Sequence, residues 1–106
     1  MIQYEILKKM LKIQATVVWK KSVEGGLSVP IVSGIQPSFS VAGDLIISRI
    51  VSTTEKEMRP EIPYDVIVEL PYGEIYDANI KEGMEFTLNV GSRVVATGIV
   101  NKKQAE

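Results

Sequence analysis

Branched aliphatic side chains dominate this chain and most limit what it can fold into. The 106 residues include 13 valines and 13 isoleucines, against only 6 leucines and 5 alanines. Valine and isoleucine are stiff about χ1 and pack well on a pleated sheet, whereas leucine and alanine favour helices. This composition predicts an all-β protein, and the length suits one domain that buries its own core.

Alternating apolar and polar residues predict where the strands lie. The clearest alternation covers residues 11–19, where every second side chain is apolar and Trp19 falls on the buried face. Six or seven strands with no helix between them are typical of a barrel or a sandwich. Residues 53–63 are expected to form a polar loop, and residues 74–82 a connection. The other strands are expected at residues 27–32, 39–41, 45–51, 64–70, 84–90 and 93–100.

Glycine and proline mark the turns between these strands. Gly25 and Gly26 follow the first strand and predict a turn with positive φ, and Pro30 confines the second strand to an edge or a bulge. Gly91 and Ser92 alone separate the last two strands. Glycine at the first central position of a two-residue loop indicates a type II′ hairpin.

Short segments flank the predicted barrel, which covers residues 11–101. Residues 1–10 combine apolar side chains at four-residue spacing with lysines off that face. They predict a short helix or an edge segment packed on the domain, and the alternative is an arm that binds a partner or RNA. Residues 102–106 form a polar tail that is expected to fray.

The composition excludes several kinds of chemistry. The chain has no cysteine and no histidine, so it has no disulfide, thiol nucleophile, imidazole base or ordinary zinc site. Its formal net charge of −1 gives no overall attraction to nucleic acid or membrane. No apolar run approaches the roughly 20 residues that a membrane helix needs, and the first residues do not resemble a secretory signal. We therefore expect a cytoplasmic protein that does not bind membranes.

The acidic residues do not form a recognisable catalytic pattern. Five carboxylates lie within seventeen residues, but their spacing fits neither a glycosidase pair nor a calcium loop. No glycine-rich phosphate loop is present either. We expect a protein that is not an enzyme and holds no metal or cofactor, with a small enzyme using a carboxylate pair as the alternative. The five carboxylates are Glu69, Glu74, Asp77, Glu82 and Glu85.

A few basic residues are candidates for a binding role. Lys20 and Lys21 follow Trp19, and such neighbours bind RNA in other proteins by stacking and phosphate contact. The phase of the first strand favours a core position for Trp19 instead. Arg93 follows the hairpin turn in an otherwise uncharged strand, so it must be exposed at a barrel end or paired.

Four stretches in sequence resemble one known family. They are Val17-Val18-Trp19 leading to Glu24-Gly25-Gly26, the loop Gly34-Ile35-Gln36-Pro37-Ser38-Phe39, the strand Val68-Glu69-Leu70, and the closing hairpin over residues 86–100. The loop is similar to the family's G-x-R-P-Q-F, and the hairpin to its G-x-R-T-V-x-x-G-x-V ending. Residues 11–100 thus resemble the C-terminal β-barrel domain (domain 3) of translation elongation factor Tu.

The resemblance implies a six-stranded antiparallel closed barrel without catalytic activity. In the family this domain packs on a GTPase domain and a second barrel, and it contacts the T-stem of aminoacyl-tRNA. Gly91 and Arg93 match the family's hairpin, but Gln36 stands where an arginine is usual. Leu27 and Ser28 replace an Arg-His pair. Fewer basic side chains mean fewer phosphate contacts, which weakens the case for RNA binding.

Two functional hypotheses follow. The first is a stand-alone binding module that engages a protein partner, such as a translation component or a related GTPase. The second is a tRNA- or RNA-binding module that retains part of the family's surface, and self-association remains open beside both. The first assigns partner binding to Gln36, Tyr72, Tyr76 and Arg93. The second assigns RNA binding to Lys20, Lys21, Gln36, Gly91 and Arg93.

Overall fold

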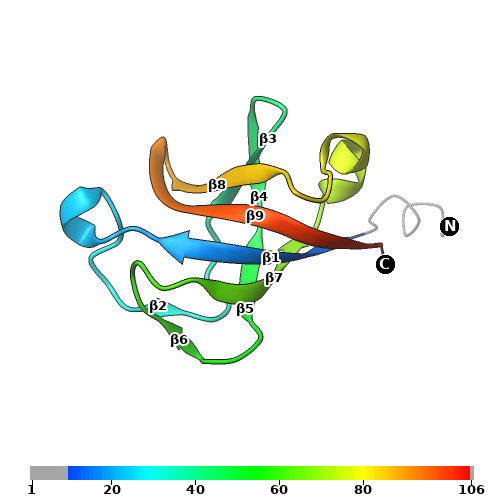
Figure 1. The fold of residues 1–106 in the computed structure, drawn as a ribbon. Helices are drawn as coiled ribbons and strands as arrows, with labels where there is room; N and C mark the ends of the chain where they lie inside the picture. Colours follow the sequence, from blue (N-terminus) through cyan, green and yellow to red (C-terminus); the bar gives the residue numbers. More distant parts are fainter. Residues whose placement is uncertain (1–9, 106) are drawn as a thin grey trace, which may run out of the picture.

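A curled antiparallel sheet makes up most of the molecule (Figure 1). The computed structural model describes residues 10–105, so the expectation for residues 1–10 lies, apart from Met10, outside the described residues. The strands are β1 (Leu11–Trp19), β2 (Ile31–Val32), β3 (Ser38–Val41), β4 (Asp44–Ile47), β5 (Arg49–Ser52), β6 (Glu57–Met58), β7 (Tyr64–Leu70), β8 (Glu85–Val90) and β9 (Arg93–Ala105). Two 3₁₀-helices, η1 (Ser22–Glu24) and η2 (Gly73–Asn79), complete the described elements.

The main sheet has the strand order β4-β3-β8-β9-β1-β7-β5 and curls into a half-barrel around the core (Figure 1). The all-β prediction is therefore confirmed. β2 and β6 form a separate two-stranded sheet.

The strand β1 pairs with both β7 and β9, and five of its residues belong to the core. Its buried and half-buried residues alternate along its whole length, as the sequence predicts. Trp19 is fully buried, which confirms its core position. Its indole N–H donates to the Sδ atom of Met58 at 3.4 Å, so the one polar atom of the ring has a partner.

The strand expected at residues 45–51 is interrupted at Ser48, and this prediction is wrong. β4, before Ser48, pairs with β3 at one edge of the sheet, and β5, after it, pairs with β7 at the other edge. Ser48 is 2% exposed, and its hydroxyl donates to the Pro37 carbonyl at 2.5 Å. One short segment of chain thus supplies both edge strands, and the buried serine lies where it passes from one to the other.

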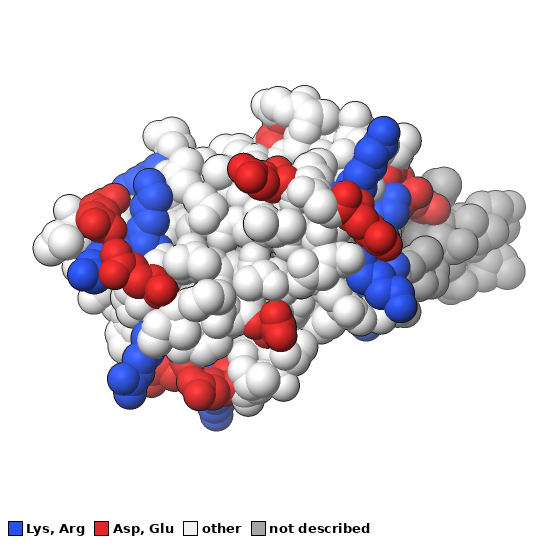
Figure 2. Space-filling view, viewed as in Figure 1, with Lys and Arg blue, Asp and Glu red and all other residues white. Residues whose placement is uncertain are grey.

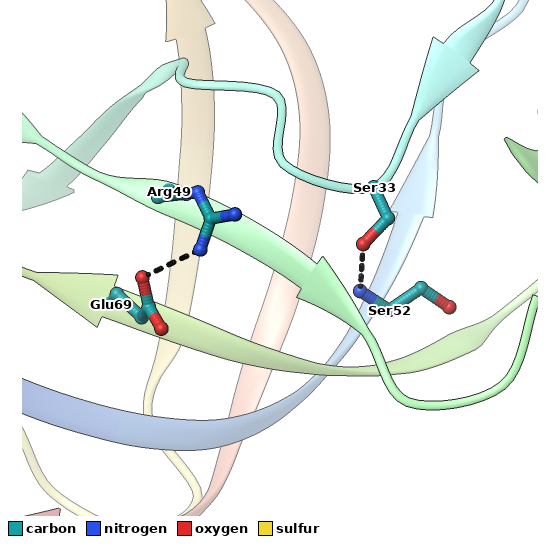
Figure 3. Close-up of polar contacts among 4 residues, drawn as sticks. All are labelled: Ser33, Arg49, Ser52 and Glu69. Atoms are coloured by element: carbon teal, nitrogen blue, oxygen red, sulfur yellow. Dashed lines mark hydrogen bonds and ion pairs between the residues drawn. The ribbon is translucent and has the colours of Figure 1, made fainter. Parts of the chain in front are cut away.

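The segment before β3 hydrogen-bonds to β5. The amide N–H of Gly34 donates to the Ile50 carbonyl at 2.7 Å, and that of Ile50 donates to the Ile35 carbonyl at 2.8 Å. The Ser52 amide also donates to the Ser33 hydroxyl at 2.9 Å (Figure 3). These bonds satisfy backbone groups on the side of β5 that faces away from β7.

The loop expected at residues 53–63 contains a strand. β6 pairs with β2, and Ile31 lies opposite Met58. β2 is shorter than the predicted segment 27–32, and it begins directly after Pro30, which has no N–H for a ladder. Ile31 and Met58 are both buried, so this small sheet adds to the core.

The residues 102–106, expected to fray, belong largely to β9. This strand continues to Ala105 and stays paired with β1 as far as Leu11. The tail is polar, but a strand needs a paired backbone rather than an apolar outer face. β9 therefore extends past residue 101, where the barrel domain was expected to end.

Two hairpin turns differ in the backbone conformation of their second central residue. Gly91 has φ +62°, and Ser92 is not among the residues with positive φ, as the predicted type II′ turn requires. In the β3–β4 turn, Ala42 and Gly43 have φ of +52° and +83°, which corresponds to a type I′ turn. Alanine pays a steric cost in this left-handed conformation, whereas glycine does not.

We expect Ser48→Ala to destabilise the protein by about 1–3 kcal/mol, because it leaves the buried Pro37 carbonyl without a hydrogen bond. The measurement is the free energy of unfolding from urea denaturation. Ser28→Ala, at an exposed serine, is the control and should change little. Equal stability of the two variants would show that the Ser48 hydroxyl does not matter.

Ala42→Asn should stabilise the protein by about 0.5–1 kcal/mol, because asparagine tolerates the left-handed conformation better than alanine. The rise in Tm from thermal unfolding measures the gain. Ala78→Asn, at an exposed alanine of η2 without positive φ, should give no such rise. A Tm of Ala42→Asn at or below the wild-type value would contradict the turn assignment.

Candidate functional site

The structure distributes the predicted site residues over three places. Gln36 is exposed in the loop that leads from β2 to β3. Tyr72 and Tyr76 belong to η2 and its N-terminal flank. The remaining predicted residues lie near η1 and the β8–β9 turn, at the opposite side of the ribbon from η2 (Figure 1). These are Lys20, Lys21, Gly91 and Arg93.

The basic residues near η1 share their end of the molecule with acidic ones. The Lys20 amide donates to the Val95 carbonyl at 2.9 Å, which places the end of β1 beside the start of β9. Arg93, the first residue of β9, is exposed there, as in the first of the two alternatives predicted for it. Lys21 forms an ion pair with Glu61 at 3.3 Å. Figure 2 shows positive and negative side chains gathered together at this end.

The helix η2, which replaces part of the connection expected at residues 74–82, is anchored at three points. Gly73 packs so closely that a Cβ atom there would lie 2.6 Å from the Cβ of Leu70. The Lys103 amine pairs with the Asp77 carboxylate at 3.0 Å and donates to the Asp77 carbonyl at 2.9 Å. The Tyr76 hydroxyl donates to Oδ2 of Asp44 at 2.7 Å. These contacts tie η2 to β7, β9 and β4.

The faces of η2 differ in exposure. Because a 3₁₀-helix has three residues per turn, residues three apart share a face. Gly73 is buried, and Tyr76 is half-buried against the core. Tyr72 and Ile75, one position earlier in each turn, are 59% and 78% exposed. The two predicted tyrosines therefore differ in exposure, and Tyr72 is the more exposed of the two.

Ile75 is a candidate that the sequence analysis missed. It is the more exposed of the two apolar side chains on this face, and its three-residue spacing from Tyr72 was visible in the sequence. That spacing predicts a shared face only if the segment is expected to form a 3₁₀-helix. We call Tyr72 and Ile75 together the η2 ridge.

The five carboxylates that cluster in the sequence have different surroundings in the structure. Glu69 pairs with Arg49 at 3.0 Å (Figure 3), and Asp77 pairs with Lys103. Glu74, Glu82 and Glu85 are exposed. Within residues 10–105, no group of three or more Asp or Glu residues is placed to hold a metal ion. No helix in the same part of the chain is long and apolar enough to cross a membrane.

The hydrogen bond between Tyr76 and Asp44 changes the acidity of the phenol. It raises the pKa of Tyr76 above the ordinary value of 10.0, since the phenol must keep its proton to donate. Partial desolvation and the negative charge of Asp44 act in the same direction.

Comparison with known proteins gives no family. No protein-family model matches the chain, and no curated protein matches it. The function of the chain is therefore inferred from its residues and their geometry.

Tyr76→Phe should reduce stability at neutral pH, where the hydrogen bond to Asp44 is intact. A folded pKa above the unfolded one means that this stabilisation is present below about pH 10 and is lost as pH rises through the folded pKa. The stability gap between wild type and variant should therefore close in alkaline solution, as measured by urea denaturation at several pH values. Tyr72→Phe is the control, and a gap independent of pH would contradict the assignment.

Proposed function

We propose that the chain is a non-catalytic binding module that holds a protein partner on the η2 ridge. The observation that carries this proposal is the exposure of Tyr72, at the N-cap of the anchored helix η2, and of Ile75, three residues later in that helix. Exposed apolar side chains grouped in this way are typical of protein–protein contacts, and tyrosine is enriched among the residues that dominate binding energy.

The anchoring of η2 supports the same proposal. The contacts of Gly73, Tyr76 and Asp77 fix the helix before any partner arrives. A surface that is already ordered loses less conformational entropy on binding, so more of the contact energy remains as affinity.

We also propose that the curled sheet is a closed six-stranded barrel of the kind found in domain 3 of elongation factor Tu. Counting β4 and β5 as one strand bent at Ser48 leaves six strands in cyclic order, since β4 borders β3 and β5 borders β7. The bonds between residues 33–35 and β5 support this closure. A barrel of this family would fit a partner from the translation machinery or a related GTPase.

The alternative of RNA binding has less support. Lys21 is neutralised by Glu61, and η1 adds the acidic Glu24 to the same end. Phosphate contacts supply most of the sequence-independent affinity for RNA, and a surface of mixed charge offers few of them. Lys20 and Arg93 remain as the basic side chains that this alternative would use.

Affinity capture from the protein's own cells tests the proposal. The bait is compared with the double variant Tyr72→Ala/Ile75→Ala, in which we expect recovery of the partner to fall at least about tenfold, because two central contacts are lost. Val23→Ala is the matched control, since Val23 is 87% exposed but lies in η1 at the other side of the molecule.

Circular dichroism is used to check that the wild type and both variants are folded before their recovery of the partner is compared. A partner recovered equally by wild type and double variant would overturn the assignment of the η2 ridge. Recovery of RNA that falls with rising salt, in place of a protein, would favour the RNA-binding alternative.

A further inference from the structure

A second site lies on the outer surface of β1, β7 and β9, built from residues other than those of η2. An open groove of about 340 Å³ is lined there by Gln14, Thr53, Asp65, Ile67 and Asn101, among others. Asp65 is the one charged residue of its lining. A single carboxylate among uncharged side chains favours a ligand that carries a positive charge.

A β-bulge shapes this groove. Gln14 lies opposite Lys102, whereas the next residue, Ala15, lies opposite Val100. Asn101 is therefore the extra residue of β9, and a bulge of this kind re-aims the side chain of the residue it adds. The Asn101 side-chain amide donates to the Thr16 hydroxyl at 2.9 Å, so the bulged residue turns toward β1.

A chain of hydrogen bonds then orients the carboxylate. The Thr16 hydroxyl, which accepts from Asn101, lies 3.2 Å from Oδ1 of Asp65 and donates to it. The Thr53 hydroxyl donates to the Asp65 carbonyl at 3.0 Å and holds the backbone of the same residue. Oδ1 is thus engaged, and Oδ2 has lone pairs that can accept from a ligand.

The side chains around Asp65 include further hydrogen-bond acceptors. Asn101 uses its amide nitrogen toward Thr16, which leaves its oxygen, and the side chain of Gln14 offers a second amide oxygen. A carboxylate with neighbouring amide oxygens matches a planar cation that has several N–H donors in fixed directions. The apolar side chain of Ile67 offers a surface for an aliphatic stem.

We infer that this groove binds a guanidinium group, presented by an arginine side chain. The guanidinium fork pairs with Asp65 Oδ2 and reaches the neighbouring amide oxygens, which a compact ammonium group cannot do with the same geometry. Lys102 is exposed on β9 opposite Gln14, whereas Asp65 belongs to β7, on the other side of β1.

The test is a titration of the full chain with N-acetyl-arginine amide, followed by two-dimensional NMR at low ionic strength. The amide signals of Thr16, Asp65 and Asn101 should shift and saturate. N-acetyl-lysine amide should bind more weakly, and the uncharged isostere N-acetyl-citrulline amide should not bind. In Asp65→Asn, which keeps the shape but removes the charge, the affinity for the arginine probe should fall at least about fivefold.

Two further variants separate the site from general electrostatics. Asn101→Ala keeps Asp65 but removes the orienting contact, and should weaken binding by about twofold or more. Glu85→Gln removes an exposed carboxylate elsewhere on the sheet and should leave binding unchanged. Absence of saturable shifts, equal binding of the citrulline probe, or equal affinity of wild type and Asp65→Asn would each overturn the inference. The Tyr72→Ala/Ile75→Ala variant should bind the probe as wild type does, whatever the capture experiment shows.

Discussion

The hydrogen bond between Ser48 and Pro37 lies at the point on which the whole sheet depends. Here a single segment leaves the ladder with β3 and joins the ladder with β7, so it forms both edges of the curled sheet. A change of partner strand leaves backbone groups without their regular bonds. A buried polar group without a partner is costly, and the serine hydroxyl supplies one partner where the ladders cannot. A buried polar contact therefore lies where the chain passes between the two edges of the sheet.

Strands with one buried face were predictable, because the two-residue period records that burial directly. β1 and β7 have the expected bounds for this reason. The break at Ser48 was not predictable, since a serine in an apolar run looks like an outward position of one strand. Likewise, the C-terminal end of β9 is a strand through its pairing with β1, which is distant in sequence, and not through its own side chains.

The candidate sites also contain one part that the sequence predicts and another part that it does not. Tyr72 was identifiable from its residue type, because tyrosine is favoured at interfaces. Ile75 and the groove around Asp65 depend on a 3₁₀-helix and on a β-bulge, and neither has a distinctive local pattern. Both sites are held by side-chain contacts to strands that are distant in the sequence. Loss of pairing in the sheet would therefore also disorder these surface sites.

The extension of β9 has a consequence for how the domain can be joined to other chains. Ala105 lies opposite Leu11, so the beginning of β1 and the end of β9 lie beside each other (Figure 1). Adjacent strand ends allow a folded domain to be inserted into a loop of a host protein without forcing that loop open. They also allow the two ends to be linked and the chain to be opened elsewhere, as in a circular permutant. The exposed residues Thr54 and Glu55, between β5 and β6, are a suitable place for the new ends.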